Sequence, residues 1–148
     1  MMTSIENKPF RIFIDTNVII DALTERDYNY LPSRQIWRNI LYGNLKGYIC
    51  SKQITDLYYI FKKYFKSEDE IRSNITNIVE SFEILPLLQG DILACLKTKT
   101  PDFEDAVLCE VAKVNMIRII VTNNPQHFEG WPLTILTPKQ TLDLFSLN

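Results

Sequence analysis

The chain has 148 residues, of which 46% are hydrophobic and 23% are charged, and its formal net charge is −2. This length and composition are typical of one soluble globular domain, and they exclude a polycation, so any nucleic-acid binding has to use a local basic surface. No apolar stretch is long enough to cross a bilayer, and residues 1–8 lack the pattern of a signal peptide, which predicts a cytoplasmic protein. The three cysteines, Cys50, Cys95 and Cys109, form no C-x-x-C pair and are predicted to be buried reduced thiols.

The first half of the chain is predicted to alternate strands and helices. Residues 10–14 form a run of β-branched and aromatic residues without polar alternation, which indicates a strand buried on both faces. Helices are expected at 17–23 and 32–42, followed by a turn bracketed by Gly43 and Gly47 and a brief strand at 48–50. Ser51 is expected to cap a long helix, and another helix is predicted from 67 to 80.

The second half continues the alternation. Strands are predicted at 82–87, 118–122 and 133–136, and helices at 89–96, at 102–114 and from Thr137-Pro138 onward, with a loop at 123–131. Alternating strands and helices predict an α/β fold with a central, mostly parallel sheet of four to five strands. No repeat or interdomain linker interrupts the pattern, so residues 1–148 are expected to form a single domain.

Polar residues recur where predicted strands end or where the following helices begin. In an open parallel sheet, ligands bind outside the carboxyl ends of the strands, near the switch in strand order. Four segments that are distant in the sequence therefore supply oxygen atoms to one edge of the sheet: Asp15, Asp56, the pair Asp102 and Asp105, and the pair Asn123 and Asn124.

Gathered carboxylates repel one another, and this repulsion favours a bound cation. Mg²⁺ and Mn²⁺ prefer hard oxygen ligands, lower the pKa of a bound water and stabilise the oxyanions of a phosphoryl displacement. The chain has only four glycines and no glycine-rich phosphate loop, which counts against a P-loop NTPase or a dinucleotide-binding protein. A Ser/His/Asp hydrolase would depend on His127, the only histidine, and no nucleophile-elbow sequence accompanies it.

Four segments resemble, in order and spacing, the motifs of PIN domains, and of bacterial VapC-type toxins most closely. They are FIDTNVIID (13–21), SKQITDLYYIFKK (51–63), DFEDAVLCEVA (102–112) and IIVTNNPQHF (119–128). The resemblance spans nearly the whole chain. It implies a three-layer α/β/α sandwich and a Mg²⁺- or Mn²⁺-dependent ribonuclease that forms a homodimer and pairs with a cognate antitoxin.

The resemblance also assigns roles to individual residues. Asp15 matches the first acid of the family, Asp56 the second, which is more often Glu, and Asp105 the third. Asn124 occupies the fourth acidic position, which removes one negative charge and implies at most one tightly held ion. Asp102 stands three residues before Asp105 on the same helical face and is a further metal-ligand candidate.

Each of these residues also has a plain structural interpretation. Asp15 is of a type that caps helices, and Asp102 suits the first turn of a helix, where its charge complements the helix dipole. Asp56 suits a helix surface, and His127 suits an exposed loop. Asp21 is expected to be a solvated helix residue, because it lies more than a turn from the strand end.

The resulting hypothesis is hydrolysis of RNA phosphodiester bonds with Asp15, Asp56, Asp105 and Asn124 as catalytic residues. The metal would be held by Asp15, Asp56, Asp105 and Asp102. The alternative is a catalytically weakened PIN-like module that binds RNA or protein, an idea motivated by Asn124. A metal titration separates the two, since an interaction module has no need of Mn²⁺.

Overall fold

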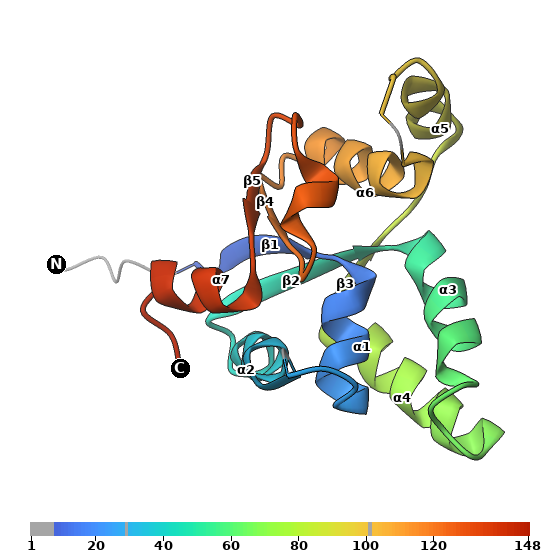
Figure 1. The fold of residues 1–148 in the computed structure, drawn as a ribbon, viewed down its shortest axis with the longest axis vertical. Coiled ribbons are helices and arrows are strands. Elements are labelled where there is room, and N and C mark those ends of the chain that lie inside the picture. Colours follow the sequence, from blue (N-terminus) through green and yellow to red (C-terminus); the bar gives the residue numbers. More distant parts are fainter. Residues whose placement is uncertain (1–7, 29, 101) are drawn as a thin grey trace, which may run out of the picture.

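The computed structural model describes residues 8–28, 30–100 and 102–148, and its centre is a five-stranded parallel sheet (Figure 1). The strands are β1 (Phe10–Ile14), β2 (Leu45–Cys50), β3 (Glu83–Leu85), β4 (Ile119–Val121) and β5 (Thr134–Leu136). They lie in the order β3-β2-β1-β4-β5, and every neighbouring pair is parallel. This confirms the predicted α/β fold and each of the predicted strands.

Helices cover both faces of the sheet, which makes the three layers that were expected (Figure 1). One face carries α1 (Thr16–Thr24), α2 (Tyr30–Leu41), α3 (Ser51–Phe61), α4 (Glu68–Ser81) and α7 (Pro138–Leu144). The other carries α5 (Gln89–Leu96), α6 (Phe103–Val114) and the 3₁₀ helix η1 (Pro125–Phe128).

Strand β1 shows why both layers form. Successive side chains of a strand point to opposite faces. Ile12 and Ile14 accordingly pack into the core of the first layer, while Phe13 packs into the core of the second. All three are at most 1% exposed, so the strand that carries the first candidate acid is fixed from both sides.

Strand β2 begins earlier than the sequence suggested. Gly47 was expected to close a turn but lies inside the strand, opposite Ile12. A Cβ atom at this position would lie 2.6 Å from Cδ1 of Ile40 and 2.7 Å from Cδ1 of Phe82. Gly47 is therefore a point of close packing between the sheet and α2, whereas Gly43, with a φ of +83°, forms the turn.

Two further expectations concern the chemistry of the chain as a whole. Cys50, Cys95 and Cys109 are buried free cysteines, as predicted. Within the described ranges, no helix has the length and apolar character needed to cross a membrane.

Candidate active site

The site lies where the strand order changes direction. The chain runs from β1 to β2 on one side, and β4 lies on the other side of β1. At such a switch point the loops after neighbouring strands diverge and leave a crevice. Asp15 follows β1 and Thr122 follows β4, so both segments open into this crevice.

Asp15 is buried and firmly held at the end of β1. It is 8% exposed, its Oδ1 accepts a 2.7 Å hydrogen bond from the backbone N–H of Thr16, and its Oδ2 accepts a 2.7 Å hydrogen bond from Thr122 Oγ1. Asp15 is thus also the N-cap of α1, and its second oxygen is oriented by a strand on the other side of the switch point. Burial raises the pKa of Asp15, and the hydrogen bonds from Thr122 and Thr16 oppose that effect.

Thr122 is in turn oriented by the polar residues around it. Its Oγ1 accepts a 3.0 Å hydrogen bond from the backbone N–H of Asn124 and a 3.4 Å hydrogen bond from Asn17 Nδ2. Asn17 also accepts a 3.1 Å hydrogen bond from the backbone N–H of Asn123. Asn124 itself is exposed at the end of this network.

Asp105 approaches from the opposite layer, in the first turn of α6. Its side chain is 14% exposed, and its Oδ2 is buried without a hydrogen-bond partner among the described residues. His127 Nδ1 lies 3.7 Å from this oxygen. Asp102 is the N-cap of α6 and accepts a 3.2 Å hydrogen bond from the backbone N–H of Asp105. Asp102 therefore has a structural role as a helix cap, at the N-terminal end of α6 where its charge also complements the helix dipole.

The electrostatics of Asp105 follow from this position. Burial, together with the charges of Asp102 and Asp15, raises the pKa of Asp105 from its ordinary value of 3.8 to about 7, although His127 opposes the shift. The carboxylate of Asp15 is therefore close enough to disfavour the ionisation of Asp105. A cation at this point would relieve that repulsion and would supply the partner that Asp105 Oδ2 lacks.

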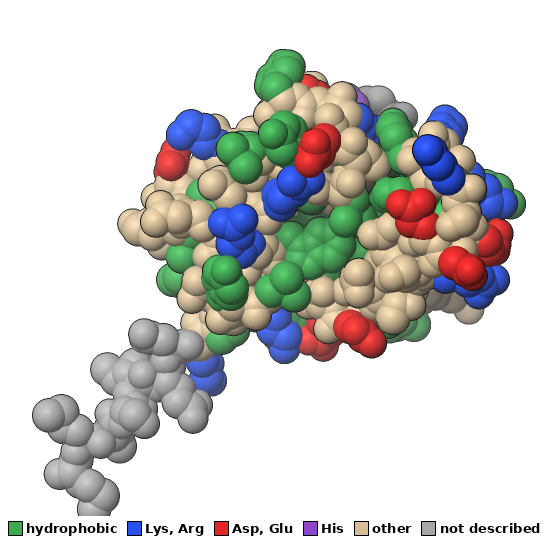
Figure 2. All heavy atoms as spheres, turned by 90° about the horizontal axis from the view of Figure 1, so that it is seen from below, with side chains coloured by type: hydrophobic (Ala, Val, Ile, Leu, Met, Phe, Trp, Pro, Cys, Tyr) green, Lys and Arg blue, Asp and Glu red, His purple; other side chains and the backbone are tan. Residues whose placement is uncertain are grey.

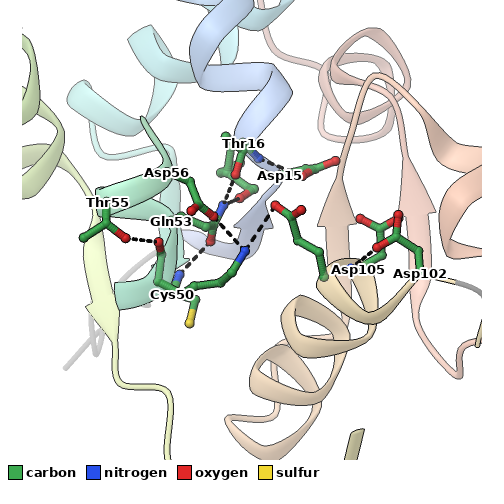
Figure 3. A network of polar contacts seen from close by, with 11 residues as sticks. Asp15, Thr16, Cys50, Gln53, Thr55, Asp56, Asp102 and Asp105 are labelled. Atoms are coloured by element: carbon green, nitrogen blue, oxygen red, sulfur yellow. Dashed lines mark hydrogen bonds and ion pairs between the residues drawn. The ribbon is translucent and has the colours of Figure 1, made fainter. Parts of the chain in front are cut away.

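Asp56 is tied to a lysine. Lys52 Nζ lies 2.7 Å from Asp56 Oδ2 on the same helix and 3.2 Å from Glu104 Oε1 on α6. In the close-up of Figure 3, Asp15 lies between Asp56, on the side of α3, and Asp105, on α6. Lys52 thus connects α3 to α6 beside the candidate acids, and it neutralises part of their charge.

The donor set suits a hard divalent ion held by few protein ligands. In the described part of the chain, no three His, Cys, Asp or Glu side chains form a group that could hold a metal ion. Mg²⁺ is usually bound by one or two carboxylates and keeps several waters. Asp15 and Asp105 fit that mode of binding, because Oδ2 of Asp105 is buried without a partner among the described residues and the charge of Asp15 acts on it.

Two buried polar residues of the neighbourhood were not singled out from the sequence as part of it. Gln53 is 1% exposed, donates to the backbone oxygen of Ile14 at 2.9 Å and accepts from the N–H of Cys50 at 2.7 Å, which docks α3 onto β1. Asp21 is 2% exposed rather than solvated, because Arg26 and Asn123 each donate to it at 2.5 Å.

Comparisons with known proteins agree with this architecture. The family model described as PIN domain matches residues 11–126. Ribonuclease VapC1 of Aquifex aeolicus is 27% identical over 135 residues, which cover 88% of this chain and 92% of that protein.

Solved structures show the same fold. VapBC2 from Rickettsia felis, bound to a DNA fragment from its promoter, superimposes with a TM-score of 0.66 at 18% identity, covering 86% of this chain and 98% of that one. Mycobacterium tuberculosis VapC20, a toxin that cleaves the sarcin-ricin loop, gives a TM-score of 0.60 at 10% identity, covering 74% and 86%. At such low identity, the similarity to these structures shows the fold alone.

Proposed function

The chain belongs to the PIN-domain family, and we propose on this basis that it is a divalent-metal-dependent ribonuclease that hydrolyses RNA phosphodiester bonds. The relative at 27% identity is a ribonuclease, which supports the reaction class. The observation that carries the proposal is the buried, unpartnered Oδ2 of Asp105 beside the carboxylate of Asp15. A structural carboxylate would have a hydrogen-bond donor at this position, since buried polar atoms are almost always paired.

Asp15 and Asp105 are the residues that would hold Mg²⁺ or Mn²⁺ directly. Asp56 and Asn124 complete the polar cluster, and Asp102 adds negative charge while it caps α6. When bound, the ion supplies Lewis acidity that lowers the pKa of a water and stabilises charge on the phosphate. A carboxylate oxygen of this cluster that the ion leaves free would orient the attacking water by accepting its hydrogen bond.

The direct test is cleavage of mixed RNA by the purified protein, with Mn²⁺ and with a chelator. We expect cleavage only with the metal, and a loss of at least about a hundredfold in Asp15→Asn and Asp105→Asn, because each variant removes a charged ligand. Asp27→Asn, an exposed acid in the loop after α1, is the matched control and should cleave like the parent. Parental activity in Asp15→Asn would overturn the proposal.

The rival function is an interaction module without catalysis, favoured by the exposed Asn124 in the fourth acidic position. Calorimetric titration with Mn²⁺ separates the two functions. Saturable binding that Asp105→Asn abolishes supports the nuclease, while the absence of binding in the parent supports the module.

We further propose that the protein is the toxin of a type II pair and binds an antitoxin segment in a groove of the first helical layer. Solved relatives are toxin-antitoxin complexes. The groove has a volume of about 660 Å³, and Figure 2 shows a hollow with a hydrophobic floor on this face. Trp37 and Leu41 of α2 line it together with Leu23 of α1, and the exposed Arg38 stands at its rim. These walls suit an apolar helical segment that carries an acidic residue.

This partner can be tested with the polypeptide encoded next to the gene. Leu41, which is 65% exposed, should be replaced by Asp, with Leu144→Asp on α7, at 58% exposure, as the control. We expect Leu41→Asp alone to lose co-purification and inhibition. Equal binding by both variants would rule out the groove. Light scattering of the same samples tests the expected homodimer.

A further inference from the structure

A second cavity adjoins the candidate site on the side of α6 and η1. Its volume is about 410 Å³, and Asp105 itself forms part of its wall. The remaining lining residues come from the segment before α6 and from η1 and the turn after it: Thr100, Asp102, Gln126, His127, Glu129 and Trp131. A ligand in this cavity would therefore contact one of the two residues that we assign to the metal ion.

The walls favour an uncharged, flat ligand. Trp131 is partly buried and packs against the cores formed by α6 and η1, and the His127 side chain is 53% exposed, so both rings are available to a ligand. Three carboxylates line the cavity, and no lysine or arginine is found among its described lining residues. Such a lining repels phosphate groups and attracts N–H donors.

The position of the cavity matches the geometry of an RNA strand. A phosphate and the neighbouring base are joined by a single ribose, so a phosphate held at Asp15 and Asp105 places a base next to them. Proteins that select single-stranded RNA bind such bases by stacking on aromatic rings and by hydrogen bonds to the base edges. A cavity of this volume lies within the range of small-molecule sites and is large enough for one nucleoside.

We propose that this cavity binds the base next to the scissile phosphate and selects guanine. The inference rests on the proposed ribonuclease function. Guanine presents two adjacent N–H donors on one edge, which one carboxylate accepts together. Asp102 already caps α6 and Asp105 faces the ion, so Glu129 is the carboxylate left to accept them, while Trp131 stacks on the base.

The first test maps cleavage sites in RNA with randomised positions, in the presence of Mn²⁺. We expect the parent to cut next to guanine and Glu129→Gln to lose at least about tenfold of that preference. The NH₂ group of the glutamine side chain would face an N–H group of guanine, so one of the two hydrogen bonds is lost. Glu83→Gln, on the far edge strand β3, is the matched control and should keep the preference. Cleavage without base preference, or a preference that Glu129→Gln leaves intact, would overturn the assignment.

The second test is independent of catalysis. The chain has two tryptophans, so Trp37→Phe leaves Trp131 as the only indole. In a chelator, guanosine should quench its fluorescence saturably, uridine should not, and Glu129→Gln should abolish the effect. Equal responses to both nucleosides, or none, would contradict the pocket. Quenching by guanosine in a protein that never cleaves RNA would support the pocket and reject the nuclease.

Discussion

Asp105 makes the stability of the metal-free protein depend on pH. Its pKa of about 7 in the folded state lies above the ordinary 3.8, so the folded state keeps a proton that the unfolded chain releases. The free energy of unfolding should therefore fall as the pH rises from about 4 to about 7 and stay low above that.

The Asp105→Asn variant should lack most of this pH dependence. We expect it to be more stable than the parent at about pH 8, by on the order of 2 kcal/mol, and to differ little at about pH 4. Urea unfolding in a chelator measures both values, with Asp27→Asn as the control that should follow the parent. If the free energy of unfolding depends on pH in the same way in Asp105→Asn and in the parent, burial and neighbouring charges do not raise the pKa of Asp105.

The sequence indicated the candidate acid Asp15 more readily than the buried polar residues around it. Asp15 could be placed from sequence because it interrupts a strand pattern, and its capping role and its place at the end of β1 follow from the same position. Gln53 and Asp21 could not, because their burial depends on partners that are distant in the sequence, such as Ile14 and Asn123. A polar residue on a helix gives no local signal that distinguishes a solvated side chain from a satisfied buried one.

At the scale of elements, Gly47 shows what the strand pattern alone missed. A glycine beside a turn suggests a loop, yet here it permits the close approach of α2 and Phe82 to β2. The strand bounds therefore depended on tertiary packing, whereas long amphipathic helices such as α3 and α4 were found at nearly the predicted positions.

Replacement of Gly47 by alanine tests this packing. The added Cβ would meet Ile40 and Phe82 at under 3 Å, so we expect a loss of about 1–3 kcal/mol in the free energy of unfolding. Gly90→Ala is the matched control, because a Cβ there meets nothing within 4 Å, and it should be neutral or slightly stabilising. Chemical denaturation of both variants measures the difference. Equal stabilities would mean that the contact relaxes at no cost.

Lys52 couples α3 to α6 across the candidate site. Because its ammonium pairs with Asp56 and Glu104, Lys52→Met should leave two carboxylates near Asp15 and Asp105 unneutralised. We expect Mn²⁺ affinity to rise roughly threefold to tenfold, while the metal-free protein loses less than about 1 kcal/mol, since the pairs are partly exposed. Calorimetry measures the affinity, with Lys46→Met, which pairs with Glu83 on the edge strand, as the control. Unchanged affinity in Lys52→Met would place the lysine outside the electrostatic reach of the ion.

For the whole molecule, the candidate site lies between the two helical layers, at one edge of the sheet. Asp15 belongs to the end of the central strand and the start of α1, and Asp105 belongs to α6 on the opposite face. The unfolded chain holds these carboxylates far apart, so an ion that bridges them binds the folded state alone. Ion binding and global stability should therefore be linked.

Thermal unfolding with increasing Mn²⁺ tests this linkage. At about 100 times the dissociation constant the ion should add about 2.7 kcal/mol, which for a chain of this size raises the melting temperature by roughly 5–10 °C. Asp105→Asn should lose more than half of that rise, because one side of the bridge becomes neutral, and Asp27→Asn should retain it. An equal rise in all three proteins would mean that Mn²⁺ binds elsewhere, since only an ion held between the sheet and α6 needs both Asp15 and Asp105 to stabilise the fold.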